Sequence, residues 1–175
     1  MKRKIKKILS LMLCFVALFM CISSVDVQAA VNEPPTARRV YFYADRQITT
    51  YNSQGTTSIG YLSRNDYCYF DYATLNNSFL RVIYPTANGK KEGWVPRREL
   101  IPSDAFIGGM VTTDGATTYR FSDLATPFGT VYKNDIVGVC EDRGNICKIL
   151  YPLDAGGYKM GWARTAELKL SLPFS

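Results

Sequence analysis

The sequence predicts an all-β protein made of two small β-barrels in tandem, behind a cleaved N-terminal signal peptide. The first 30 residues have the charge and hydropathy pattern of a secretory signal. A set of residues then recurs after about 68 positions, which indicates an internal repeat. Within each copy, short runs rich in Val, Ile, Tyr, Phe and Thr are separated by Gly, Asn, Asp and Pro, a pattern typical of strands joined by tight turns.

The targeting segment has three parts in the expected order. A basic stretch precedes the almost wholly apolar residues 8–22, and small residues follow. Val27 and Ala29 fit the −3 and −1 positions, so we expect residues 1–29 to be removed, with cleavage after Ala30 as an alternative. The apolar run is short for a membrane span of about 20 residues. Cys21 would allow a lipoprotein, but the bulky Phe19 and Met20 precede it.

Most of the net positive charge of the chain lies in this segment. Five of the 21 basic residues and one of the 15 acidic residues fall within residues 1–30, which leaves 16 and 14, a net charge of +2. A balance so close to neutral does not indicate nucleic acid as a partner. We expect a secreted, extracellular protein that meets a membrane only through its signal segment before cleavage.

The repeat rests on anchors that keep their order and spacing. They are Gly60 to Asp66 against Gly129 to Asp135, Leu80 to Pro85 against Cys147 to Pro152, and Gly93-Trp94 to Leu100 against Gly161-Trp162 to Leu168. The stretch from Ile48 to Tyr51 also matches Ala116 to Tyr119. A unit this long exceeds a solenoid repeat, so we expect each copy to form its own core.

The strands are predicted from runs of β-branched and aromatic residues bounded by turn residues. No segment shows a helical period. The first copy offers residues 39–44, 48–51, 67–71, 79–84 and 93–96, with a short end piece at Leu100. The second copy offers residues 109–113, 117–120, 136–141, 147–151, 159–163 and 168–170. Short strands in this number favour a small barrel in each copy.

These anchors resemble the bacterial Src-homology-3-like (SH3b) domain family. The resemblance is carried by the Gly-to-Asp turn, by a Lys/Arg-Val/Ile-x-Tyr strand end and by the Gly-Trp pair with its acidic-Leu ending. It implies two SH3-like barrels, at residues 37–102 and 106–172. It also implies a module of exported bacterial proteins that often binds cell-wall peptidoglycan. Residues 50–55 and 118–122 replace the family's Asn-Val-Arg-Ser-Gly-Pro stretch, which helps to line its ligand face.

The absence of histidine limits the chemistry available to the chain. It excludes a Ser-His-Asp triad, a Cys-His pair and histidine-ligated metals. We therefore expect no enzyme, no cofactor and no metal site. Paired carboxylates can hydrolyse glycosides without histidine, so a wall hydrolase that uses acids alone is a remote alternative. Asp66 and Asp135 follow an asparagine in a turn, where they are expected to cap the backbone.

Three cysteines remain after the signal. Cys140 and Cys147 flank a predicted turn between neighbouring strands, where their Cβ atoms could come within disulfide distance. An oxidising space outside the cell would allow that bond, and the sequence leaves the oxidised and reduced states open. Cys68 is expected to be a small buried hydrophobic residue rather than a nucleophile.

Aromatic side chains are the better candidates for a binding site. Tyr and Trp on a shallow surface can stack on sugars or pack against a peptide. Tyr41 and Tyr43 alternate with Val40 and Phe42, so one of these pairs must face outward. The ligand-binding candidates are Tyr51, Trp94, Tyr119 and Trp162, with Asp45 and Asp114 as partners for a ligand amine.

The sequence therefore predicts a secreted, non-catalytic binding protein. Its expected partner is a cell-wall polymer, peptidoglycan or a wall-linked peptide, and association with the cell wall would follow. Two weak sites on a repetitive polymer would gain avidity. An interaction module for a secreted or surface protein is the alternative.

Overall fold

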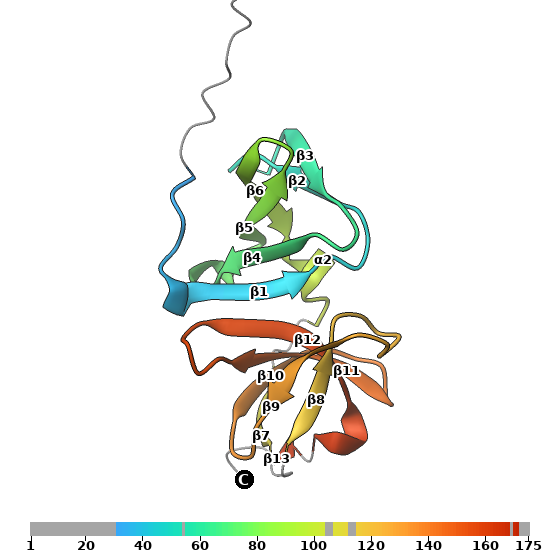
Figure 1. The fold of residues 1–175 in the computed structure, drawn as a ribbon. Coiled ribbons are helices and arrows are strands. Elements are labelled where there is room, and N and C mark those ends of the chain that lie inside the picture. The colour runs from blue at the N-terminus through green and yellow to red at the C-terminus, as the bar shows by residue number, and fades with distance from the viewer. Residues whose placement is uncertain (1–30, 54, 104–106, 112–114, 169, 172–175) are drawn as a thin grey trace, which may run out of the picture. The chain divides into compact units, whose positions relative to one another are not determined.

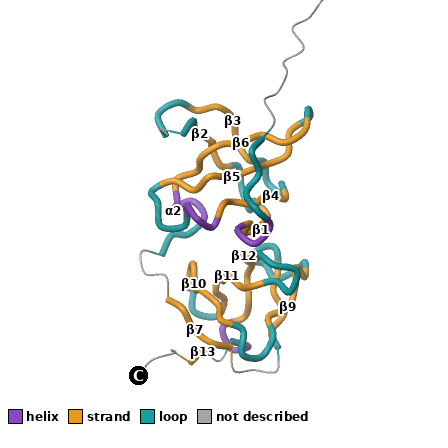
Figure 2. The backbone as a smooth tube through the Cα atoms, turned by 90° about the vertical axis from the view of Figure 1, so that its left-hand side faces the viewer, coloured by secondary structure: helices purple, strands orange, loops and turns teal. Residues whose placement is uncertain are grey.

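The computed structural model describes residues 31–53, 55–103, 107–111, 115–168 and 170–171, and they form an all-β protein. The predicted fold class is confirmed at this level. Strands and loops make up nearly the whole described backbone, and the helical segments are short (Figure 2). None of the helices in these ranges is long and apolar enough to cross a membrane. The predicted signal peptide and Asp114 lie outside the described residues.

The first half, residues 31–103, contains six strands, and the second half, residues 107–171, contains seven (Figure 1). The first-half elements are η1 (Thr36–Arg38), β1 (Arg39–Tyr43), β2 (Ile48–Tyr51), β3 (Ser58–Leu62), β4 (Tyr67–Asp71), η2 (Tyr72–Thr74), β5 (Phe79–Thr86), β6 (Gly89–Pro96) and α2 (Arg97–Leu100). The second-half elements are β7 (Ile107–Val111), β8 (Ala116–Tyr119), β9 (Pro127–Val131), β10 (Ile136–Asp142), β11 (Ile146–Pro152), β12 (Tyr158–Arg164), η3 (Thr165–Glu167) and β13 (Leu170–Ser171).

The two halves pair their strands in the same order. In the first half the order is β1-β4-β5-β6-β2-β3, and in the second it is β7-β10-β11-β12-β8-β9, with β13 added beside β7. The ladder between β2 and β3 shifts register at Thr50/Tyr51, and the ladder between β8 and β9 shifts at Thr118/Tyr119. The repeat in the sequence therefore corresponds to a repeat in strand pairing. The end piece expected at Leu100 is the short helix α2 instead.

Each half contains the same buried polar pair. Thr50 Oγ1 lies 3.0 Å from Tyr84 Oη, and Thr118 Oγ1 lies 2.7 Å from Tyr151 Oη. The repeated glycine leaves room for the tyrosine hydroxyl, because a Cβ at Gly129 would lie 2.6 Å from Tyr151 Oη. These buried hydroxyls satisfy each other, which removes the cost of leaving them unpaired.

The halves are joined through their strands and through one of the two cores. Strand β1 pairs in parallel with β12, with Val40 opposite Tyr158. The second core consists of second-half residues alone. The first core, built around residues such as Phe42 and Phe70, also takes in Cys140, Leu150 and Met160 of the second half. The expectation that each copy forms its own core is therefore correct for the second half and wrong for the first.

Candidate functional site

An aromatic face lies on the outside of β2, β5 and β6. Alternate residues of a strand point to opposite sides of the sheet, so the buried Leu80 and Val95 place Phe79 and Trp94 outward. Trp94 is directly opposite Tyr51 and is partly exposed. The ring of Tyr51 meets that of Phe79 edge-on, with 6.1 Å between centroids. Two predicted site residues, Tyr51 and Trp94, therefore lie together in the first half.

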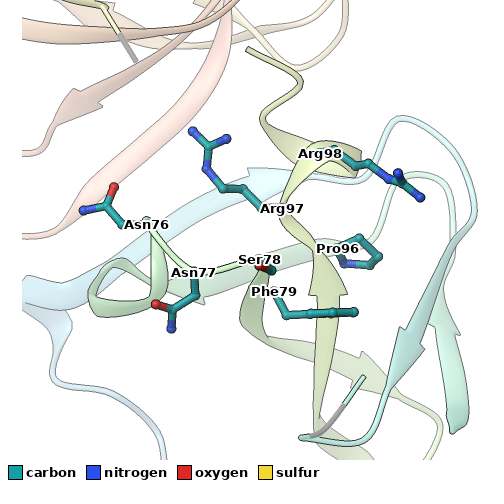
Figure 3. Close-up of a pocket in the computed structure, with 7 residues that line it drawn as sticks. All are labelled: Asn76, Asn77, Ser78, Phe79, Pro96, Arg97 and Arg98. Atoms are coloured by element: carbon teal, nitrogen blue, oxygen red, sulfur yellow. The ribbon is translucent and has the colours of Figure 1, made fainter. Parts of the chain in front are cut away.

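A groove of about 610 Å³ continues this face at the end of β6. Figure 3 shows Phe79 beneath Pro96, with the side chains of Arg97 and Arg98 pointing away from each other. Arg97 is held in place, because its Nε donates to the carbonyl oxygen of Leu75 at 3.0 Å and its Nη1 to that of Ser103 at 3.1 Å. Arg98 is exposed. The lining consists of Asn76, Asn77, Ser78, Phe79, Pro96, Arg97 and Arg98.

The loop between β2 and β3 covers the other side of Phe79. Gly55 has a φ of 70°, in the left-handed region that favours glycine, and a Cβ there would lie 2.5 Å from the Phe79 ring. Asn52 Oδ1 accepts the backbone N–H of Thr56 at 3.0 Å and fixes the turn. This loop takes the position in which the family's ligand-lining stretch was expected.

The second half has a groove at the corresponding place. Its volume is about 580 Å³, and it is lined by Leu124, Gly144, Asn145, Ile146, Arg164, Thr165 and Ala166. Ile146 stands where the first half has Phe79, as the strand pairing shows: Ile146 is opposite Arg164, and Phe79 is opposite Pro96. The second groove therefore lacks the aromatic wall of the first.

The structure corrects the prediction that Trp162 binds a ligand, because only 1% of this side chain is exposed. Trp162 lines a small, enclosed cavity with first-half residues that include Phe42 and Leu100. The guanidinium of Arg143 lies 4.5 Å from its ring centroid and the Lys148 ammonium 5.1 Å. The prediction failed because a partly apolar outer face of the second half packs against the first half, so the repeated tryptophan is used for packing.

The other predicted residues are divided between the halves. Tyr119 is opposite Trp162 and partly exposed. Asp45 is partly buried and lies 3.1 Å from the Arg46 guanidinium, so its carboxylate already has a cation. Tyr41 and Tyr43 face outward, while Val40 and Phe42 are buried in the core.

The cysteines are buried free thiols, so the disulfide between Cys140 and Cys147 is not formed. The antiparallel register places Cys147 opposite Asp142, and a bulge interrupts the ladder at Cys140. The two side chains consequently belong to different cores. Burial raises the pKa of Cys140 to about 12 and also raises the pKa values of Cys68 and Cys147. None of the three is a thiolate at neutral pH.

Sequence reasoning missed the groove residues Phe79, Pro96 and Arg98. The charged Arg81, between the apolar Leu80 and Val82, could have identified the outward face of this strand, to which Phe79 also belongs. Asp66 and Asp135 do cap turns as predicted, since their Oδ2 atoms accept the N–H groups of Ser63 at 2.7 Å and Tyr132 at 2.8 Å. Within the described ranges, no group of His, Cys, Asp and Glu side chains could hold a metal ion.

No model of a protein family, no curated protein and no solved structure matches this chain.

Proposed function

We propose that this chain is a secreted, non-catalytic binding protein of two SH3-like barrels that recognises peptidoglycan or wall-linked peptides of the cell wall. The barrels correspond to residues 37–102 and 106–172. One observation carries the proposal: the open first-half groove, whose lining combines the ring of Phe79 with the exposed amides of Asn76 and Asn77 and the exposed guanidinium of Arg98.

The groove chemistry fits a peptide that carries a carboxylate. The exposed side chains of Asn76 and Asn77 can each donate to and accept from a peptide backbone. Phe79, with Tyr51 and Trp94 beside it, offers an apolar surface for small side chains or for the face of a sugar ring. The exposed Arg98 can pair with a carboxylate in a two-point contact. Wall peptides joined to sugars combine these groups.

In this proposal only the first half recognises the ligand, and the second half acts as a support. The tryptophan of the second half is covered by the first half, and Ile146 replaces the aromatic wall. The expected gain in avidity from two equal sites is therefore not part of the proposal. The non-catalytic role is supported by the lack of histidine and by the raised pKa values of the buried thiols.

Sedimentation with purified, protein-stripped cell walls tests the proposal. The protein should pellet with the walls, and Trp94→Ala and Phe79→Ala should each weaken binding by about fivefold or more, because each removes an aromatic contact worth about 1 kcal/mol or more. Ile146→Ala, at the corresponding position of the second half, is the matched control and should bind like the unchanged protein.

Three results would refute the proposal. These are no sedimentation with walls, equal binding by Phe79→Ala and the unchanged protein, or loss of turbidity of a wall suspension, which would indicate a hydrolase. Binding to a surface protein but not to stripped walls would favour the interaction-module alternative.

A further inference from the structure

A second aromatic surface lies outside the groove, where β1 and β4 approach the second half. It consists of Tyr41, Tyr43, Tyr67, Phe121 and Phe128, here called the tyrosine face. Tyr41 stacks on Tyr67 with 5.7 Å between centroids, and Tyr43 lies 4.9 Å from Tyr67. Phe128 lies 5.2 Å from Tyr43. The face therefore contains side chains of both halves.

Packing alone does not account for this surface. Tyr67 is at the centre of the ring contacts and is still 45% exposed. The second half forms the same pair of strands without tyrosine: Met110 pairs with Ile136 where Tyr43 pairs with Tyr67, and Gly108 pairs with Gly138 where Tyr41 pairs with Tyr69. The strand pair itself does not require tyrosines, which leaves a role outside the fold for the exposed one.

Three cations border the tyrosine face. The Arg120 guanidinium lies 4.3 Å from the Tyr43 ring centroid, Lys159 Nζ lies 4.5 Å from that of Phe128, and the Arg64 guanidinium lies 6.0 Å from that of Phe121. None of the three forms an ion pair with a carboxylate of a described residue.

Two of these cations are also incompletely solvated or hydrogen-bonded. Arg120 Nε is buried and has no hydrogen-bond partner among the described residues. Asp45, which lines the same small cavity, pairs with Arg46 instead. Lys159 donates to the carbonyl oxygen of Phe128 at 3.0 Å, and burial lowers its pKa. A bound anion would compensate for this desolvation.

The other border of the surface provides a contrast. Arg39 and Lys90 both lie over the Tyr69 ring, but Glu33 pairs with both, at 3.0 Å and 2.6 Å. One carboxylate therefore offsets part of the positive charge beside Tyr69, whereas no ion pair among the described residues offsets it beside Phe121 and Phe128. This asymmetry identifies the part of the face that an anion would occupy.

We propose that the tyrosine face binds an anionic saccharide. The apolar side of the sugar ring would lie on Tyr67 and its neighbours, and the carboxylate or phosphate would meet Arg64, Arg120 and Lys159. A neutral sugar would lose the charged contact. This site is separate from the groove and does not depend on the groove's binding a wall peptide.

A matched series of sugars tests the proposal on the full protein by NMR chemical-shift titration. N-acetylmuramic acid supplies a carboxylate, N-acetylglucosamine 6-phosphate supplies a phosphate, and N-acetylglucosamine is the neutral reference. At least one charged sugar should bind about fivefold or more tightly than the neutral one, and added salt should reduce the difference. The stronger of the two charged sugars then shows whether carboxylate or phosphate is the natural source of charge.

Variants locate the site. Tyr67→Ala and Arg64→Gln should each weaken binding of the charged sugar by about threefold or more. The control is Ile136→Ala, at the position that corresponds to Tyr67, and it should bind as the unchanged protein does. Equal affinity for charged and neutral sugars, no binding of either charged sugar, or unchanged binding by Tyr67→Ala would overturn the proposal. Loss of binding in Trp94→Ala alone would assign the sugar to the groove and would also overturn it.

Discussion

The two halves share one order of strands but expose different residues. Trp94 and Trp162 hold the same place in that order, each opposite a tyrosine, yet Trp94 is partly exposed and Trp162 is buried. Phe42 and Leu100 of the first half line the cavity beside Trp162. A duplicated motif therefore does not produce a duplicated site, because one copy can be used to hold the other.

The neighbouring residues show why the second copy is the covered one. Met160 occupies the position on β12 that Glu92 occupies on β6, since Met160 is opposite Leu150 and Glu92 is opposite Ile83. Met160 belongs to the first core, whereas Glu92 forms an ion pair with Arg81 at 2.6 Å. An apolar residue on the outer face gains free energy when another surface covers it, and a charged residue loses free energy.

The largest difference between the halves is expected from the two tryptophans. Trp162→Ala should lower the free energy of unfolding by about 3–5 kcal/mol, because it leaves a cavity beneath Arg143 and Lys148. Trp94→Ala should cost about 1 kcal/mol, because its side chain is already partly in water. Urea unfolding followed by circular dichroism measures both values. Equal losses of stability would show that the two tryptophans are covered to the same extent in solution.

The strands could be predicted because their signal is local. Strands β2 and β4 match the predicted residues 48–51 and 67–71 at both ends. Strands β3 and β9 were missed, because each contains a glycine, Gly60 or Gly129, in a stretch that was interpreted as a turn. Each of these glycines lies close to a tyrosine hydroxyl that is distant in sequence, and this contact has no local signature.

The candidate site could be predicted only in part. Tyr51 and Trp94 were both predicted as site residues and each belongs to a recurring motif, but only the structure shows that they lie opposite each other. The burial of Trp162 depends on contacts with Phe42 and Leu100, which come from the other copy, and a comparison of the copies one by one does not include such contacts. The sequence did contain one signal for this burial, because the second copy has the apolar Met160 at the position where the first copy has the charged Glu92.

A smaller contrast is expected between the two loops that precede β3 and β9. Gly55, with a φ of 70°, and Leu124, with a φ of 56°, hold equivalent turns, since their N–H groups donate to the carbonyl oxygens of Asn52 and Phe121. Gly55→Ala should cost about 2 kcal/mol, from the left-handed backbone and the contact with Phe79. Leu124→Gly should change the free energy of unfolding by less than about 0.5 kcal/mol. Glycine removes the strain of the left-handed backbone at this position, and this gain offsets the larger conformational entropy of the unfolded chain.

Thermal unfolding of both variants checks this contrast, and wall sedimentation adds a second measurement. Gly55→Ala should also weaken wall binding, because Phe79 must move away from the new methyl group. A Gly55→Ala protein as stable as the unchanged one would show that the loop does not hold this turn in solution. If the variant lost stability but still bound walls fully, the loop would have no role in the groove.

The smallest contrast is expected from the two buried tyrosines at high pH. Burial raises the pKa of Tyr151 to about 12, and although burial also raises the pKa of Tyr84, its shift is smaller. The folded Tyr151 keeps its proton at a pH where the unfolded chain releases it. Its contribution to stability is complete below pH 9 and is lost as the pH rises from about 10 to about 12.

The unchanged protein should lose free energy of unfolding between pH 8 and pH 10.5, and Tyr151→Phe should make this loss smaller by about 1 kcal/mol. Tyr84→Phe should reduce the loss by a smaller amount. Each variant also loses its hydrogen bond to Thr118 or Thr50, but that loss is the same at both pH values and cancels from the comparison. Urea unfolding of the three proteins at the two pH values gives the slopes. Identical slopes would mean that neither hydroxyl is held more strongly protonated in the folded protein, and the two cores would then be equally accessible to water at these positions.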